Sequence, residues 1–269
     1  MPQPIAAIWR SVPADIALKT DQCLSRACEQ RNIGGPVSLF FRADDVAVPG
    51  RQLVRLMALF SSFRVPLSLA VVPAWLTESR WRQLKRIGAR TPELWCWHQH
   101  GWRHANHENK NKKQEFGPGR SASQIRKDLV RGKDRLESLL DNDFYPVFTP
   151  PWNRCGSDTL IQLEELGYRG VSRSSGSLPL PPEGLPDFQV NVDLHTRRDP
   201  DPSLGWDRLL ADLESAVKGG TCGIMIHHQL MNDAAFEFLE MLLRSIVNQK
   251  GVAPTDFRWL DGYDSIRYE

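Results

Sequence analysis

The sequence predicts an α/β fold, a single closed or nearly closed parallel (β/α) barrel of about seven strands over residues 1–269. The first observation behind this prediction is an alternation of strand-like apolar runs with segments of helical periodicity. The second is that no linker or change of composition interrupts the alternation, which favours one domain. The third is that polar, titratable clusters follow several predicted strands, where parallel barrels carry their active sites.

The first half of the chain alternates between the two element types. Its strands are short apolar runs, and its helices repeat apolar residues every three or four positions. Thr77 is the expected N-cap of one helix, because its hydroxyl can accept a backbone N–H of the first turn. The predicted order is helix 14–32, strand 37–41, helix 51–63, strand 66–73, helix 77–89, strand 93–100, a polar loop near 106–119, helix 121–140 and strand 145–152.

The second half continues the pattern. Ser157 or Asp158 is the expected cap of the next helix, and Gly167 is its expected end. A proline-rich stretch at 174–187 is typical of a loop between two strands. The predicted elements are helix 157–168, strand 168–174, strand 188–195, helix 203–220, strand 221–228 and helix 232–249.

Composition excludes several classes of protein. The 34 basic and 32 acidic residues leave a formal charge of +2, too small to indicate nucleic acid or an anionic membrane as the main partner. The five cysteines are scattered without a CxxC pair, which argues against a disulfide framework and a thiolate zinc site. Because the N-terminus lacks a signal-peptide pattern and no apolar run approaches ~20 residues, we expect a cytoplasmic protein without membrane insertion. The sequence leaves the oligomeric state open.

Two adjacent carboxylates follow the first predicted strand. Asp44 and Asp45 repel each other if both are buried and ionised, so the pair needs a cation or a raised pKa on one member. An isolated Asp-Asp pair also suits a solvated helix cap. Other candidate ligands in the sequence therefore decide between the two interpretations.

Four of the seven histidines lie between residues 98 and 107, in HQHGWRHANH. His100 and His104, at i and i+4, fall on one face of a helical turn and can both reach one zinc ion, with a carboxylate from elsewhere as the third ligand. His98 and His100, at i and i+2, share a face only in an extended chain. The two interpretations compete for His100, whereas His107 alone suits a solvated loop.

Three further groups follow later strands. Pro151 and Trp152 form a rigid turn in which Trp152 either packs structurally, stacks on a sugar ring or presents its N–H to an oxyanion. His227 and His228 end an apolar strand, and only one of them can easily face a site because successive side chains alternate. His195 lies in a charged stretch that suits a solvated loop or a supporting role.

The order of these motifs resembles the polysaccharide deacetylases of carbohydrate esterase family 4, whose catalytic domain is a distorted parallel β/α barrel. The resemblance covers roughly residues 37 to 230. RADDV corresponds to the family's TFDDG motif, which implies Asp44 as the general base and Asp45 as a metal ligand. His100-Gly-Trp-Arg-His104 matches the spacing of H-[ST]-x-x-H, which implies two histidine ligands.

Two later motifs correspond as well. TPPWN corresponds to the family's RPPYG or RPPWG motif. The resemblance thus implies that Trp152 occupies the position whose main-chain N–H binds the oxyanion. Ile224-Met-Ile-His227 corresponds to the Leu-x-x-His that supplies the catalytic acid, and Asp193 is the nearest candidate for the aspartate that assists it. The resemblance leaves His98 and His228 as supporting residues.

The chain also departs from the family pattern. Val46 replaces glycine in the first motif, and Gly101 replaces serine or threonine in the second. Thr149 stands where the family has the arginine that orients the base. Either Arg42 or Arg154 must then supply the positive charge, or the base is tuned differently.

The resemblance implies a metal-dependent hydrolase that removes an acetyl group from an N-acetylated sugar, with one divalent ion, expected to be Zn²⁺, and a carbohydrate as partner. Two alternatives remain. One is an amidohydrolase-like metal hydrolase that uses His98 and His100 with His195 and His227. The other is a catalytically degenerate domain that only binds glycan.

Overall fold

The computed structural model describes residues 5–31 and 34–262, which fall into two compact units. Unit 1 comprises residues up to Ala43, Gly50–Leu67 and Asn191–Asp256; unit 2 comprises Asp44–Pro49, Ser68–Val190 and the residues from Phe257. Eight strands occur among the described residues, against about seven predicted. The strand pairs β1–β7, β1–β8, β6–β7, β3–β4 and β4–β5 are parallel, which confirms the α/β class. A single domain over residues 1–269 stays a prediction.

Unit 1 has the strand order β6-β7-β1, with β8 also paired to β1. Helix α1 packs on α6 and α7, and α6 packs on β7. Ala43 of β1 pairs with Ile226 of β7, and Asp193 of β6 pairs with Met225, so the carboxyl ends of these strands lie together. The elements are α1 (Ile16–Glu29), β1 (Val37–Val46), α2 (Arg51–Phe63), β6 (Val192–Asp193), α6 (Pro202–Lys218), β7 (Thr221–Ile226), α7 (Asp233–Asn248) and β8 (Val252–Thr255).

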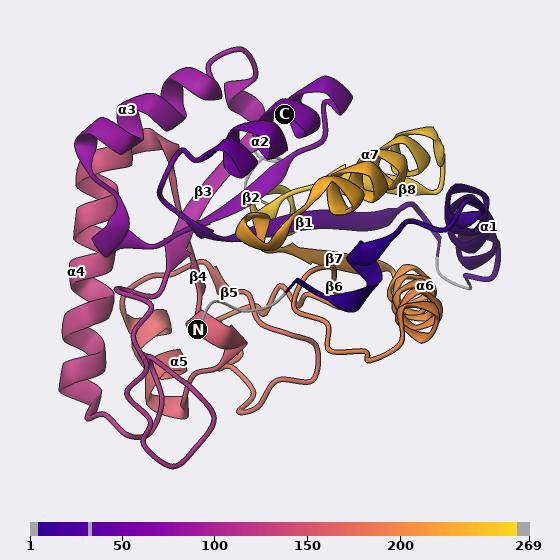
Figure 1. Ribbon diagram of the computed structural model, residues 1–269. Helices are drawn as coiled ribbons and strands as arrows, with labels where there is room; N and C mark the ends of the chain where they lie inside the picture. Colours follow the sequence, from indigo (N-terminus) through magenta and orange to yellow (C-terminus); the bar gives the residue numbers. More distant parts are fainter. Residues whose placement is uncertain (1–4, 32–33, 263–269) are drawn as a thin grey trace. The chain divides into compact units, whose positions relative to one another are not determined.

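Unit 2 has the strand order β5-β4-β3-β2. Helix α4 packs on α5 and β4, as Figure 1 shows at its left side. Short 3-10 helices follow β2 and β4, namely η2 (Pro73–Trp75) and η5 (Pro151–Asn153). The other elements are β2 (Leu67–Val71), α3 (Glu78–Ile87), β3 (Trp95–His100), α4 (Ala122–Leu140), β4 (Phe144–Thr149), α5 (Ser157–Glu165), β5 (Gly170–Val171) and α8 (Phe257–Leu260).

Most predicted elements are confirmed with shifted ends. β1 is longer than predicted, because Arg42 and Ala43 still pair with β7 and the chain stays buried through Asp44. The two strands expected at 168–174 and 188–195 shrink to the two-residue strands β5 and β6. β8 was not predicted, since its four residues include a proline and lack a clear apolar alternation.

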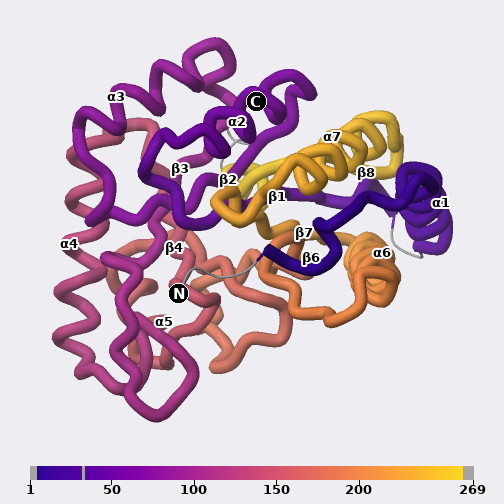
Figure 2. The backbone as a smooth tube through the Cα atoms, in the orientation of Figure 1, coloured from indigo at the N-terminus to yellow at the C-terminus, as the bar shows by residue number. Residues whose placement is uncertain are grey.

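The segment between β3 and α4 is long, as the tube in Figure 2 shows, and hydrogen bonds connect its own residues. The His107 N–H donates to the Gln114 carbonyl at 2.9 Å, and the Gln114 N–H donates to Asn106 Oδ1 at 3.0 Å. Phe116 then enters the core of unit 2 and contacts Phe148 edge-on, with ring centroids 5.2 Å apart. The predicted polar loop is therefore anchored at its end by an apolar side chain.

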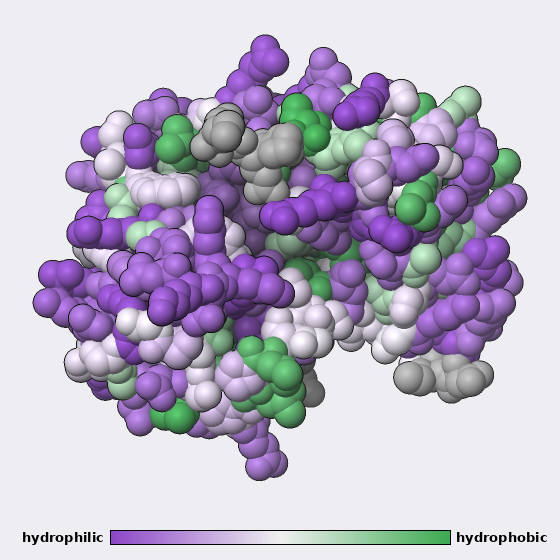
Figure 3. All heavy atoms as spheres, turned by 60° about the horizontal axis from the view of Figure 1, so that its bottom comes forward, coloured by the Kyte–Doolittle hydropathy of each residue, from purple (hydrophilic) through white to green (hydrophobic). Residues whose placement is uncertain are grey.

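The surface carries no extended apolar band in the view of Figure 3, where hydrophilic residues surround separate apolar patches. The most exposed large apolar side chains are Leu178 and Leu180, at 77% and 75%. Both belong to the proline-rich loop that the sequence predicts at 174–187. Within the described residues, no helix is long and apolar enough to cross a membrane.

One close contact fixes α4 against the end of β3. Gln99 is fully buried, and its Nε2 donates to the Gly101 carbonyl at 3.0 Å. The Tyr168 hydroxyl donates to Gln99 Oε1 at 2.6 Å. A Cβ at Gly132 of α4 would lie 2.2 Å from Gln99 Nε2, so only glycine permits this approach.

We therefore predict that Gly132→Ala destabilises the protein by about 1–3 kcal/mol, because overpacking against a bonded amide outweighs the better helix propensity of alanine. The measurement is urea unfolding followed by circular dichroism. Ser138→Ala, at an exposed position of the same helix, is the matched control and should be neutral or slightly stabilising. A Gly132→Ala protein as stable as the control contradicts the packing argument.

Candidate metal centre

Three of the predicted site residues converge in unit 2. The Nε2 atoms of His100 and His104 each lie 3.3 Å from Asp45 Oδ1. One ligand atom from each residue lies within 4.8 Å of the others. The His100 side chain is 2% exposed, and those of His104 and Asp45 are 17% and 20% exposed. The cluster is thus open on one side and closed on the other.

Parallel strand pairing sets the orientation of His100. His100, the last residue of β3, pairs with Thr149, the last residue of β4. His100 Nδ1 lies 2.9 Å from the Thr149 carbonyl oxygen, and because a carbonyl only accepts, Nδ1 carries the proton. In the neutral ring, Nε2 therefore presents its lone pair toward Asp45. This arrangement, with the far nitrogen held by a carbonyl, is typical of histidines that bind metal ions.

Backbone in the left-handed region is concentrated at this cluster. Six non-glycine residues of the described chain have positive φ, and four of them, Asp45, His104, Trp152 and Asn153, belong to the site or its adjoining turn, with φ between 58° and 61°. This conformation is costly for residues other than glycine and persists where surrounding contacts enforce it. At Asp45 and His104, it occurs at two of the three converging side chains.

The donor set fits a divalent ion such as Zn²⁺. Two imidazole nitrogens and a carboxylate leave a position for water, as in catalytic zinc sites. Metal–ligand bonds of about 2.0–2.1 Å in a tetrahedron place ligand atoms roughly 3.3–3.4 Å apart, which agrees with the 3.3 Å distances here. Nickel, cobalt and iron also accept such ligands, so the donor set does not select one metal.

The two histidines differ in their affinity for protons. Burial opposes the charged form of His100, but Asp45 and Asp44 outweigh it and raise the pKa of His100. Burial, together with the nearby His100, lowers the pKa of His104. His104 is therefore the ring more readily kept neutral, as metal ligation requires.

His98 is not a member of the cluster. Its Nε2 lies 3.0 Å from Thr149 Oγ1, and its ring packs edge-on against Phe257 with centroids 4.8 Å apart. His98 is fully buried. The threonine that replaces the family's arginine thus contacts His98 through its hydroxyl and His100 through its carbonyl.

The predicted base and its candidate arginines lie in different environments. Asp44 is 2% exposed and directly precedes Asp45 of the cluster. Arg42 is fully buried in β1, two positions earlier, and its Nη2 lies 3.2 Å from Met225 Sδ. Arg154 is exposed, and its Nη1 donates to the Lys113 carbonyl at 3.4 Å.

Two tryptophans contact His104. The Trp152 ring lies edge-on to His104 with centroids 4.4 Å apart, and the Trp75 ring lies 5.9 Å away. Both are partly exposed. The buried Pro151 supports the turn from beneath, since its Cγ would lie 2.6 Å from a Cβ at Gly101. Sequence analysis identifies Trp152 and Pro151 but misses Trp75, which lies two residues after a proline at the end of a predicted strand.

The remaining predicted residues lie in unit 1. His227 directly follows β7, and its backbone N–H donates to His195 Nδ1 at 3.2 Å. Burial, with His227 and His228 nearby, lowers the pKa of His195 far below its ordinary value and so favours the neutral ring. Because Nδ1 accepts the His227 N–H, the proton of that neutral ring belongs on Nε2. The Asp193 carboxylate accepts the N–H groups of His195 and Thr196, each at 2.9 Å. Asp193 thus caps the turn after β6, and its assistance to His227 stays a prediction.

Sequence analysis also misses Glu115. This residue is fully buried, and its carboxylate accepts backbone N–H groups from the turn that carries His104. A signal was present, because Glu115 directly precedes an apolar residue, Phe116, in a polar loop rich in lysine and asparagine. Nothing in the sequence says which backbone groups it reaches.

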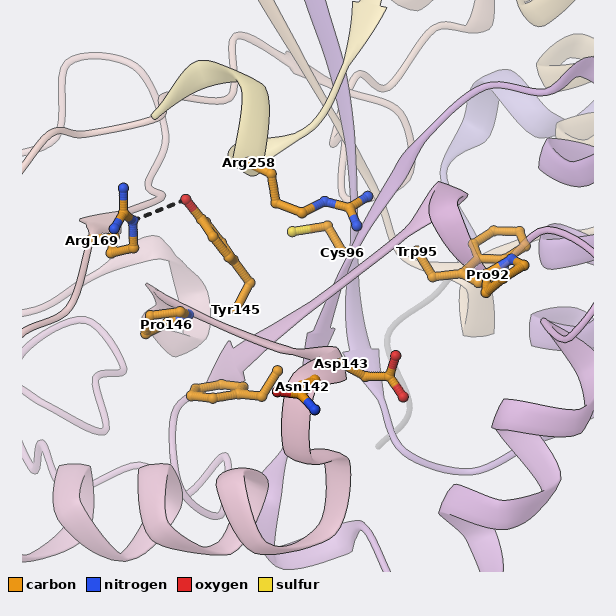
Figure 4. A pocket seen from close by; sticks show the side chains of 10 residues that line it. Pro92, Trp95, Cys96, Asn142, Asp143, Tyr145, Pro146, Arg169 and Arg258 are labelled. Carbon is orange, nitrogen blue, oxygen red and sulfur yellow. Dashed lines mark hydrogen bonds between the residues drawn. The ribbon is translucent and has the colours of Figure 1, made fainter. Parts of the chain in front are cut away.

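A separate pocket of about 350 Å³ opens in unit 2 at the amino ends of β3 and β4 (Figure 4). Its polar groups bond to one another or to backbone: Arg169 Nε donates to the Tyr145 hydroxyl at 3.1 Å, Tyr145 donates to Asp261, and Arg258 donates to the Glu93 carbonyl at 2.7 Å. His100 lies at the opposite, carboxyl end of β3. In parallel barrels the face at the amino ends of the strands usually contributes to stability, whereas active sites lie at the carboxyl ends.

No protein-family profile and no curated protein sequence matches the chain. Solved structures do match it. A Mycobacterium smegmatis protein assigned to the polysaccharide deacetylases is 15% identical, with a TM-score of 0.62, over 88% of this chain and 96% of that one. A family 4 carbohydrate esterase from Streptomyces lividans, in complex with acetate, is 12% identical, with a TM-score of 0.51, over 83% and 93%.

A third neighbour is a family 4 pseudoenzyme from Bacillus anthracis, 13% identical with a TM-score of 0.50 over 81% of this chain and 63% of that one. Enzymes and a pseudoenzyme thus share this fold. At these identities the likeness concerns the fold, and it agrees with the order of motifs in the sequence. The chain therefore has the distorted (β/α)-barrel fold of the carbohydrate esterase family 4 polysaccharide deacetylases, as a divergent representative of that fold.

Proposed function

We propose that this protein is a metal-dependent hydrolase that removes an acetyl group from an N-acetylated sugar or glycan precursor. The observation that carries the proposal is the convergence of His100 Nε2 and His104 Nε2 on Asp45 Oδ1, each at 3.3 Å. The fold supports a carbohydrate deacetylase, since the Streptomyces lividans neighbour is a family 4 carbohydrate esterase. A cytoplasmic location stays a prediction.

Asp45, His100 and His104 would hold the ion, with Zn²⁺ as the proposed metal. When bound, a divalent ion polarises the amide carbonyl and makes water a good nucleophile at neutral pH. Asp44 takes the proton of the attacking water, a role that suits a carboxylate next to a ligand yet outside the converging group. The Thr149 carbonyl holds the proton of His100 on Nδ1 and thereby keeps Nε2 available.

Two further roles complete the proposed reaction. The Trp152 backbone N–H donates to the oxyanion as the carbonyl carbon becomes tetrahedral. His227 protonates the departing amine, and neutral His195 fixes its position by accepting the His227 backbone N–H. His228, which follows His227 and is buried, has a supporting role in this proposal.

Arg42 is the proposed source of the positive charge that Thr149 lacks. It is fully buried and two residues before Asp44 on the same strand, so their side chains leave the strand on one face. A buried guanidinium is stable only with anionic or strongly polar partners, which makes it suited to fixing a carboxylate. Arg154 is less suited, because it is exposed and reaches a carbonyl.

The second candidate is a non-catalytic carbohydrate-binding domain. Two observations favour it: threonine at the position of the family's arginine, and a pseudoenzyme among the structural neighbours. Both candidates keep the fold. They differ in whether acetate is released.

The proposed metal site predicts that substitutions of His104 and His98 have different effects on Zn²⁺ binding. His104→Ala should abolish stoichiometric Zn²⁺ binding, because it removes one of three ligands. His98→Ala should retain the metal, because His98 contacts Thr149 and Phe257 instead. The measurement is metal content after dialysis, by inductively coupled plasma mass spectrometry. Loss of metal in His98→Ala with retention in His104→Ala would support the amidohydrolase-like alternative.

The proposed base predicts a separation of binding from chemistry. Asp44→Asn should bind Zn²⁺ yet release acetate at least about 100-fold more slowly, because an amide cannot accept the proton of water. The measurement is acetate release from a panel of N-acetylated sugars beside metal content. Unchanged acetate release in Asp44→Asn would sink the assignment of the base, and no release by the wild type on any sugar would favour the binding domain.

The exposed face of Trp75 predicts a binding effect. If this ring stacks on the sugar, Trp75→Ala should raise KM by about 3–10-fold with metal content unchanged, since an aromatic contact contributes roughly 0.5–1.5 kcal/mol. Steady-state acetate release measures it. Trp259→Ala is the matched control, because Trp259 is a 52% exposed tryptophan at the far end of unit 2's sequence. Equal KM values for both variants would exclude a role for Trp75.

A further inference from the structure

A buried carboxylate lies directly behind the turn that carries His104. Glu115 Oε1 accepts the Arg103 N–H at 2.7 Å, and Glu115 Oε2 accepts the N–H groups of Trp102 and His104 at 3.2 and 3.1 Å. One side chain thus satisfies three consecutive backbone donors. The third of these donors belongs to a metal ligand.

The backbone around Glu115 is fixed from the other side. Phe116, the next residue, is fully buried in the core of unit 2. Its carbonyl accepts the Gly156 N–H at 2.9 Å and the Thr159 hydroxyl at 2.8 Å. Glu115 therefore extends from a rigid point toward the turn, and its carboxylate can hold the turn in one conformation.

Gly101 provides the space for this carboxylate. Its φ of +58° lies in the left-handed region, and a Cβ there would lie 2.2 Å from Glu115 Oε2. Any other residue at position 101 would displace the Glu115 carboxylate and Pro151, or the turn itself. The Glu115 carboxylate can therefore occupy this place only because residue 101 has no side chain.

The turn needs such support because His104 has a positive φ of 58°. A non-glycine residue holds this conformation only where its surroundings impose it. The Glu115 hydrogen bonds act on the N–H of His104 itself and on the two residues before it. Charge-assisted hydrogen bonds from backbone N–H groups to a carboxylate are about twice as strong as neutral ones.

We propose that Glu115 is the positioning residue of the metal centre: it holds the 102–104 turn so that His104 Nε2 meets Asp45 and His100, and Gly101 is required to admit it. The inference rests on the proposed metal-binding function. It goes beyond that function because two residues that do not bind the metal, Glu115 and Gly101, hold His104 in the position of a ligand. Glu115 itself touches neither substrate nor reacting atoms.

The experiment compares Zn²⁺ affinity in Glu115→Gln and Glu108→Gln, measured by competition with a chromogenic chelator. Glu115→Gln keeps the volume but turns an amide N–H₂ toward backbone donors, so we expect the Kd for Zn²⁺ to rise about 10–100-fold. Glu108 is the matched control: it is buried in the same loop, and its carboxylate accepts the Gly119 N–H at 2.9 Å. Glu108→Gln should lower the melting temperature of the metal-free protein without raising this Kd.

The visible spectrum of the Co²⁺-loaded protein adds a readout that general destabilisation does not change. Glu115→Gln should change the intensity of the visible Co²⁺ absorption bands, because His104 moves within the coordination sphere. Glu108→Gln should leave these bands unchanged. If Glu115→Gln does not fold, Glu115→Asp takes its place, because its carboxylate is one methylene shorter and cannot reach the same three N–H groups. Wild-type affinity and spectrum in the folded variant overturn the inference about Glu115. Absence of Zn²⁺ binding by the wild type overturns the proposed metal site instead, so the two failures are distinguishable.

Discussion

The site depends on one carboxylate oxygen, Asp45 Oδ1, which lies 3.3 Å from two imidazole nitrogens. These groups come from two separate segments of the chain, and two of the three residues have left-handed backbone. Three polar groups held this close together in a largely buried place are stable only with a shared proton or a cation. The surrounding contacts, from the Thr149 carbonyl to the Glu115 carboxylate, serve to keep the nitrogens turned toward that oxygen.

The departures from the family motifs make physical sense as linked changes. Gly101 lacks the side chain that the family has there, and the space holds the carboxylate of Glu115. Thr149 lacks the family's guanidinium, and its hydroxyl lies 3.0 Å from Nε2 of the buried His98. Neither change removes one of the three converging side chains, Asp45, His100 and His104. Such compensation is expected where a fold keeps its site while individual contacts are replaced.

The sequence was sufficient for the fold class and for the residues that converge. Helical and strand periodicity located the long elements. The i, i+4 spacing singled out His100 and His104, but the helical turn expected there is wrong: His100 ends β3, and His104 has a positive φ in a non-helical turn. The sequence did not locate the short strands correctly. β5 and β6 have only two residues each, and pairing with neighbouring strands defines them rather than a local pattern of residues. Glu115 escaped because its role is defined by backbone groups of a turn eleven to thirteen residues earlier, and no residue-type pattern records which N–H groups a carboxylate will accept.

The most direct test of the central claim uses the wild-type protein. Metal is removed with a chelator and Zn²⁺ is then added back, while bound metal per chain and acetate release from N-acetylated sugars are followed together. The account predicts one ion per chain, loss of acetate release on removal and its recovery on reloading. Failure to bind Zn²⁺ at all, or acetate release that continues in the metal-free protein, would contradict it.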